Sequence, residues 1–136
     1  MTLQIHLDSY CKAFNGRSLD AALSLFSDHA LFEMPLLGQR LFGKGEITAG
    51  LRRIFEVTES ATIALSGRKE SLRVIIAEGQ LDAKLHRDSS SVRIPLAISL
   101  EAQDGRISRL STYLDARPYR LWSDRVIFAT SQPSSN

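Results

Sequence analysis

The residues best suited to acid/base chemistry are three isolated polar side chains in apolar surroundings. Glu33 lies in the apolar stretch LFEM, and Pro35 must end that strand because proline fixes φ and cannot donate a ladder hydrogen bond. Asp82 lies in a later stretch of alternating polar and apolar residues, and Tyr10 lies in an early apolar stripe. A carboxyl group in an apolar pocket has a raised pKa and can exchange a proton near neutral pH. Glu33 and Asp82 are therefore candidates for an acid/base pair, with Tyr10 as a hydrogen-bond donor.

Each candidate also has an ordinary structural explanation. Glu33 could point to solvent or lie at a strand end. Asp82 could belong to a solvated sheet face that it shares with Lys84 and His86. Tyr10 could be a core residue whose hydroxyl group meets a backbone partner. Both kinds of explanation remain open at this point.

Length and charge restrict the class of protein. The 136 residues fit a single domain, which we expect over residues 1–130, followed by a disordered tail over 131–136. The 17 basic residues are scattered and form no stripe interleaved with aromatic side chains, so we expect no nucleic-acid partner. The histidines and Cys11 show no metal-ligand spacing, and the glycines Gly43 and Gly45 lack the surroundings of a phosphate loop. We therefore expect no metal and no cofactor.

Cysteine content and hydropathy indicate the compartment. A lone cysteine, Cys11, is typical of a reducing environment. No apolar run reaches the roughly 20 residues that span a membrane. His6 and Asp8 are unlike the apolar segment of a secretory signal peptide. These features predict a cytoplasmic protein without a membrane partner.

The hydrophobic period divides the chain into a helical first part and a β-rich second part. A period near 3.6 predicts helices over 3–15, from Ser18 to Phe26, and over 44–57, with a strand that begins at Leu31. From residue 60 the period is two, as in strands. The strands that this period predicts are 61–66, 72–86, 92–102 and 106–115. This order predicts an α+β domain, in which three N-terminal helices pack on a cone-shaped, strongly curved mixed or antiparallel sheet around an internal pocket.

The order of elements and several short motifs resemble the nuclear-transport-factor-2-like superfamily, in its SnoaL-like and ketosteroid-isomerase-like branch. The motifs are YCKAFN from Tyr10, LFSDHALFEMP from Leu25, Gly43 with its helix, DGRI from Asp104 and YLD from Tyr113. They span nearly the whole chain. Because this fold hosts isomerases, cyclases, epoxide hydrolases, dehydratases and non-enzymes, the resemblance implies a fold more than a reaction.

Of the three catalytic residues of ketosteroid isomerases, this chain has a matching residue at one position. The helix-one tyrosine that donates to the oxyanion corresponds to Tyr10. The position of the catalytic base holds Met34, and the position of the protonated aspartate holds Ala97.

The resemblance to limonene-epoxide hydrolases and SnoaL-type cyclases is also partial. The Asp-Arg-Asp set of the hydrolases corresponds to Asp82, Gln80 and Thr112, and Glu33 replaces their asparagine. The acid of the cyclases falls in the region of Thr112 and Leu114. No catalytic set known from these relatives is therefore complete.

Two interpretations of the sheet faces follow. Alternation alone places the apolar residues Leu81, Leu96 and Ile98 against the helices and leaves Asp82 in solvent. The resemblance instead implies that the face of Asp82, Ala97 and Thr112 lines the cavity. We adopt the second interpretation. An apolar outer face then needs cover, which predicts a homodimer through the outer sheet face.

The sequence thus predicts a domain that binds a small apolar ligand, with cofactor-free acid/base chemistry of isomerase, cyclase or hydrolase type on a ring-containing molecule. The alternative is a non-catalytic ligand-binding or dimeric assembly module, and the sequence leaves open whether the protein is an enzyme. Glu33 and Asp82 are expected to face one cavity, at least one of them with a raised pKa, beside the donor Tyr10. The side chains expected to contact the ligand are Phe14, Met34, Phe55, Gln80, Ala97, Thr112 and Leu114.

Overall fold

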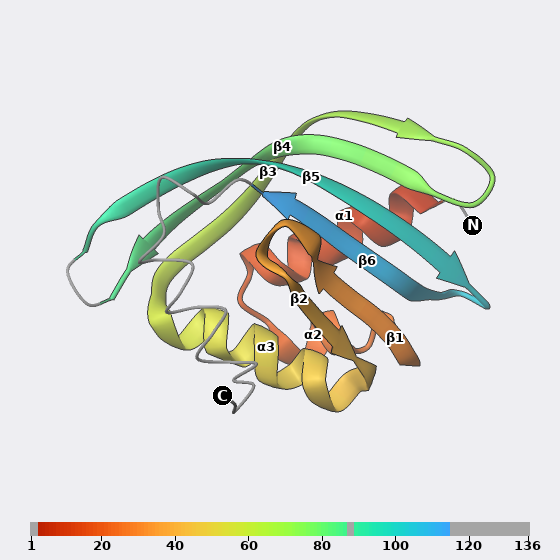
Figure 1. Cartoon of the computed structure of the whole chain (residues 1–136), viewed down its shortest axis with the longest axis horizontal. Coiled ribbons are helices and arrows are strands. Elements are labelled where there is room, and N and C mark those ends of the chain that lie inside the picture. Colours follow the sequence, from red (N-terminus) through yellow and green to blue (C-terminus); the bar gives the residue numbers. More distant parts are fainter. Residues whose placement is uncertain (1–2, 87–88, 115–136) are drawn as a thin grey trace.

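The computed structural model describes residues 3–86 and 89–114 of the chain (Figure 1). The predicted domain over 1–130 extends past these residues and stays a prediction, and the expected tail lies outside them. None of the helices described is long and apolar enough to cross a membrane. In chain order the elements are α1 (Leu3–Asn15), α2 (Leu19–Leu23), β1 (Phe26–Met34), the 3₁₀ turn η1 (Pro35–Leu37), β2 (Gln39–Phe42), α3 (Gly43–Val57), β3 (Thr58–Glu70), β4 (Ile75–Leu85), β5 (Ser91–Gln103) and β6 (Arg106–Leu114).

Helix α1 follows the apolar stripe that predicts it. Leu7, Tyr10 and Phe14 are buried, since spacings of three and four residues place them on one face. At the end of the helix, the Asn15 side-chain amide donates to the Ile63 carbonyl oxygen at 3.0 Å, and its oxygen accepts from the Ile63 N–H at 2.7 Å. Asn15 thereby pairs backbone groups that the edge strand β3 would otherwise leave open.

The turn between α1 and α2 is tied to the end of α3. Ser18 caps α2 as predicted, because its hydroxyl oxygen accepts from the Ala21 N–H at 3.2 Å. The Arg17 guanidinium donates to the carbonyl oxygens of Phe55 at 2.5 Å and Thr58 at 2.8 Å, and it lies over the Phe55 ring. Such donors satisfy the last carbonyls of a helix, so they hold the three helices together.

The six strands form one mixed sheet in the order β2-β1-β6-β5-β4-β3. Strands β3 to β6 are antiparallel neighbours, and β1 runs antiparallel to β2 but parallel to β6. Figure 1 shows the sheet arching over the helices, which lie on one of its faces. The predicted α+β architecture of three helices packed on a mixed sheet is confirmed.

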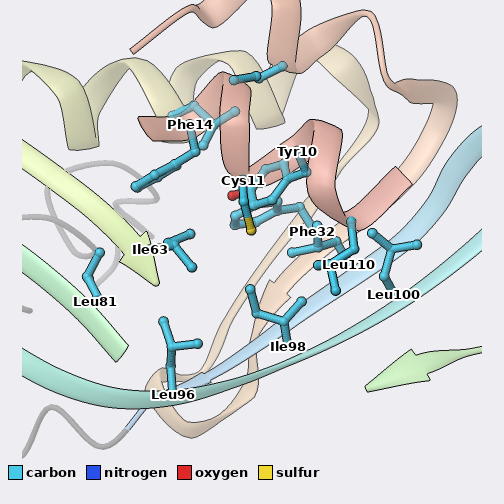
Figure 2. Close-up of a cluster of buried hydrophobic side chains, with 14 of the residues drawn as sticks. Tyr10, Cys11, Phe14, Phe32, Ile63, Leu81, Leu96, Ile98, Leu100 and Leu110 are labelled. Atoms are coloured by element: carbon cyan, nitrogen blue, oxygen red, sulfur yellow. The ribbon is translucent and has the colours of Figure 1, made fainter. Parts of the chain in front are cut away.

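The apolar face of the sheet is the one that meets the helices. Leu81, Leu96 and Ile98 are buried, and Figure 2 shows them pointing toward the side chains of α1. Asp82 and Ala97 alternate with these residues and lie on the outer face. The inference from the resemblance, that the face of Asp82 and Ala97 lines the interior, is therefore wrong.

This result also removes the reason given for a dimer. Along β5, the side chains of Ile94, Leu96, Ile98 and Leu100 are buried within the protein's own core. They need no second copy to cover them. A dimer through the outer face, if it forms, must rest on other residues.

Several elements differ from the pattern, and among them α2 ends at Leu23 rather than at Phe26. Strand β1 begins at Phe26, five residues before Leu31, because an irregular register with β6 lets it pair early. Strand β3 continues past the predicted end at residue 66 to Glu70, because a bulge near Gly67 keeps it paired with β4. The four-residue strand β2 was not predicted, since so short a segment shows no clear period.

Candidate ligand-binding cavity

A cavity of about 40 Å³ lies between the helices and the inner face of the sheet. This volume suffices for a water-sized group but is far below the roughly 300–1,000 Å³ of typical ligand sites. Most of the lining is apolar, and the hydroxyl groups come from one tyrosine and one threonine. The lining residues are Tyr10, Phe14, Phe32, Met34, Leu37, Ile54, Ala61, Ile63, Leu81, Leu96, Thr112 and Leu114.

Tyr10 is held by other aromatic rings. Its ring centroid lies 6.1 Å from those of Phe14 and Phe26 and 6.5 Å from that of Phe32 (Figure 2). Burial, with a smaller contribution from Cys11, raises the pKa of the Tyr10 hydroxyl, which therefore stays protonated near neutral pH. Within residues 3–86 and 89–114, no group forms a hydrogen bond with this hydroxyl. It is a fixed donor that faces the cavity.

Thr112 brings a second hydroxyl group from the sheet. It lies on β6 opposite Ile98, which places it on the inner face beside Leu114. Its side chain is buried, and its hydroxyl has no hydrogen-bond partner in the part of the chain that the structure describes. Tyr10 and Thr112 are therefore the two residues of the described lining whose hydroxyl groups a guest molecule could hydrogen-bond.

Glu33 lies on the other face of the sheet from the cavity. Its strand neighbours Phe32 and Met34 line the cavity, so the intervening side chain points away. The carboxylate is only 5% exposed. It accepts hydrogen bonds from Arg109 Nη2 at 2.5 Å, Arg109 Nε at 3.1 Å and Ser111 Oγ at 2.9 Å.

The charges around Glu33 decide its ionisation. Burial by itself raises the pKa of the carboxyl group, but the hydrogen bonds from Arg109 and Ser111, with the charges of Arg109 and Arg40, outweigh burial. The pKa of Glu33 therefore lies below its ordinary value, so Glu33 does not provide the raised pKa that was expected of at least one member of the pair. A carboxylate with a lowered pKa and an arginine partner is a poor proton acceptor near neutral pH.

Asp82 has an arginine partner of its own. Its carboxylate accepts from Arg93 Nε at 2.7 Å and from the Gln80 side-chain amide at 3.1 Å. All three residues lie on the outer face, as does Ala97, which pairs with Tyr113. Gln80 and Ala97 therefore do not line the cavity.

The predicted acid/base pair is not assembled in the structure. Glu33 and Asp82 share no cavity, because each lies on the outer face with its own arginine. Tyr10 lies in the cavity as expected. Of the expected ligand contacts, four line the cavity: Phe14, Met34, Thr112 and Leu114.

The remaining expected contact stands just behind the cavity. Phe55 is half-buried and packs its ring on that of Phe14, with centroids 5.6 Å apart. The lining also contains residues that were not among the expected contacts: Phe32, Leu37, Ile54, Ala61, Ile63, Leu81 and Leu96. Ile63 could have been found from the sequence, because it lies in a predicted strand that alternates between a buried and an exposed face. Leu37 could not, because the short segment after Pro35 has no hydrophobic periodicity.

The described residues neither form a metal site nor provide a reactive thiol. In the described ranges, no three histidine, cysteine, aspartate or glutamate side chains lie close enough to hold a metal ion. Burial, and then the charge of Asp8, raises the pKa of the Cys11 thiol to about 11. Cys11 is thus a protonated, packed thiol rather than a nucleophile near neutral pH.

The described lining can donate hydrogen bonds and exclude water, but it contains no carboxylate, imidazole or amine. Proton abstraction from a ligand would need such a base. The geometry is that of an apolar binding site for an uncharged guest with a hydrogen-bonding atom.

Solved structures with the same fold cover most of the chain at low sequence identity. A protein with a ketosteroid isomerase-like fold from Catenulispora acidiphila, in complex with trimethylamine, has a TM-score of 0.76 at 14% identity and covers 93% of this chain and 91% of its own. A proposed SnoaL-like polyketide cyclase from Shewanella denitrificans has a TM-score of 0.78 at 15% identity, with 90% and 94% covered. TerC, co-crystallised with polyporic acid, has a TM-score of 0.75 at 16% identity, with 85% and 93% covered.

The sequence itself matches a family model over most of its length. A search of the curated proteins finds no match. The model of the SnoaL-like domain, in contrast, matches residues 7–110, a range that begins within α1 and ends within β6. The chain therefore belongs to the SnoaL-like domain family.

Proposed function

We propose that this protein binds a small, uncharged and mostly apolar molecule in the cavity between its helices and its sheet. The observation that carries the proposal is the pair of hydroxyl groups, on Tyr10 and Thr112, that face the cavity without partners among the described residues. An oxygen or nitrogen atom of a guest would satisfy them, and the rest of the guest would contact apolar walls.

The absence of charge in the described lining supports an uncharged guest. Moving an ion from water into such a cavity is unfavourable unless a partner of opposite charge receives it. Two arginines of the sheet, Arg109 and Arg93, pair with Glu33 and Asp82 on the outer face. An organic anion would therefore find no counter-charge in the described lining.

The ligands named for two structures of the same fold are small organic molecules. One of these proteins holds trimethylamine and another holds polyporic acid, so the fold accommodates small organic molecules. Our proposal that this chain binds a ring-containing apolar ligand rests on its own cavity. Cofactor-free chemistry of cyclase or isomerase type would need a base from outside the described lining.

Replacing Tyr10 by phenylalanine is expected to weaken the binding of a neutral ring ketone by about tenfold, since one hydrogen bond is lost while the ring keeps its packing. Cyclohexanone is a suitable probe, and the measurement is an NMR titration of methyl-labelled protein. The Ile63 and Leu96 methyl resonances should shift saturably.

Cyclohexanecarboxylate serves as the matched charged probe and should leave these resonances unshifted. The Phe55→Leu variant is a control, because Phe55 stands behind the cavity without lining it. Equal affinity of the wild type and Tyr10→Phe for cyclohexanone, or tighter binding of the carboxylate, would refute the proposed site.

We also propose that two copies associate through the outer face of the sheet, for a reason different from the one that the sequence suggested. On neighbouring strands of that face lie Ile76, Ala97, Ser99 and Tyr113. Ile76 is 52% exposed and Tyr113 is 38% exposed, so the patch offers apolar surface, and the exposed Glu78 lies beside it, opposite Ala97. An exposed apolar patch of this kind can pack against its own copy around a two-fold axis.

Light scattering after size-exclusion chromatography tests this association. The wild type is expected to elute as a dimer at micromolar concentration, and Tyr113→Arg as a monomer, because like charges would meet across the two-fold axis. Leu72→Arg, on a fully exposed residue of the β3–β4 turn, is the control and should remain dimeric. A monomeric wild type would reject the interface.

A further inference from the structure

The side chains that line the cavity differ in their exposure to solvent. All lining residues are buried except two, Leu37 and Ile54, which are half-buried. The buried walls come from α1 and from strands β1, β3, β4, β5 and β6, and their apolar side chains belong to the core cluster, so displacement would break core packing. In the described part of the chain, Leu37 and Ile54 are therefore the lining residues most accessible to solvent.

The segment that carries Leu37 is weakly held. The turn η1 contributes no fully buried side chain, and Leu36 at its centre is 64% exposed. Gly38 ends the turn with φ of 69°, in open space where even an added Cβ atom would meet no neighbour within 4 Å. A short turn with little buried surface can open at low free-energy cost.

We propose that ligands enter between Leu37 and Ile54, and that these two side chains set the width of the molecule that reaches Tyr10 and Thr112. This inference rests on the proposed binding function and extends it to access and size selection. A cavity of about 40 Å³ must widen to admit a ring. Displacement of η1 widens it without disturbing the buried walls, so the site should favour narrow, uncharged molecules over bulky ones.

Access can be measured without knowledge of the natural ligand. The chain's single cysteine is replaced in the variant Cys11→Ala, and Thr112→Cys then places one thiol in the cavity. The rate of its reaction with methyl methanethiosulfonate, a small neutral reagent, reports passage through the entrance. Adding Leu37→Ala should raise this rate by about tenfold, and adding Leu37→Phe should lower it.

Leu81→Ala is the matched control, since it makes the same truncation in a buried wall of the same cavity. If labelling occurs through general unfolding, Leu81→Ala will accelerate it at least as much as Leu37→Ala does. The inferred entrance predicts the reverse order. It also predicts that Leu37→Ala accelerates the bulkier benzyl methanethiosulfonate more than the methyl reagent.

The outcomes separate this inference from the binding function. Selective acceleration by Leu37→Ala, with no binding of cyclohexanone to the wild type, would uphold the entrance and defeat the function. If the wild type binds cyclohexanone but neither Leu37 variant changes the labelling rate, the binding function is upheld and the proposed entrance is wrong. Should Leu81→Ala fail to fold, the opposite effects of Leu37→Ala and Leu37→Phe still decide the result.

Discussion

Replacing Gly79 by alanine is expected to lower the free energy of unfolding by about 3 kcal/mol or more. Strand β4 approaches β3 so closely at Gly79 that an added Cβ atom would lie 2.0 Å from the Ala64 carbonyl oxygen and 2.8 Å from Leu65 Cα. Both are backbone atoms beside the β3 bulge, so no side chain can move aside to relieve the clash. Urea denaturation followed by circular dichroism measures the loss.

Gly45→Ala is the matched control. Gly45 lies in the first turn of α3, and an added Cβ atom there would meet nothing within 4 Å. Its stability should be unchanged or slightly raised, because alanine favours the helix. A Gly79→Ala protein as stable as Gly45→Ala would show that β3 and β4 do not approach in this way.

Replacing Arg109 by methionine is expected to destabilise the protein by about 2 kcal/mol at neutral pH. The substitution keeps much of the side chain's apolar stem but removes the main partner of a buried carboxylate, Glu33. Ser111 and Arg40 remain near the carboxylate, and Arg109 itself is half-exposed, so the loss stays below that of a fully buried pair. Urea denaturation between pH 3 and 8, a range we choose around the ordinary glutamate pKa of about 4.3, measures it.

The pH dependence of stability distinguishes the variant from the wild type. In the wild type the folded-state pKa of Glu33 is lowered, so its contribution is present above the unfolded pKa of about 4.3 and is lost as pH falls toward the folded value. Without Arg109, burial dominates and the folded pKa rises. The deficit of Arg109→Met should therefore shrink as pH falls through that raised pKa.

Arg93→Met provides the comparison on the same sheet face. Arg93 pairs with Asp82 in a similar contact, but both side chains are substantially exposed. Solvent screens such a pair, so its loss should leave stability unchanged within error. Equal effects of Arg93→Met and Arg109→Met, at every pH, would contradict the role given to the burial of Glu33.

Local patterns in the sequence predicted much of the fold. Helix α1, the Ser18 cap and the alternating strands could be predicted because they depend on residues close together in the sequence. The evidence for them is hydrophobic periodicity and the preference of serine for the helix N-cap. Alternation also predicted the correct inner face of the sheet. The burial of Leu81, Leu96 and Ile98 decides which face meets the helices, whereas the correspondence with catalytic positions of relatives pointed to the opposite face.

The site was harder to predict because its contacts are distant in sequence. Glu33 stood out as a lone acid in an apolar strand, but its partner Arg109 lies 76 residues away on the parallel neighbour β6. No local pattern specifies that pairing. The same strand pair places Thr112 in the cavity and Ser111 outside it, a distinction that depends on register alone.

The most direct test of the cavity as a binding site is an NMR measurement of nuclear Overhauser effects between bound cyclohexanone and the methyl groups of the protein. The proposal predicts contacts from the ligand to the methyl groups of Ile63, Leu96 and Leu114, all of which line the cavity. Contacts confined to Ile76 on the outer face, or none at a ligand concentration that saturates the resonance shifts, would contradict it.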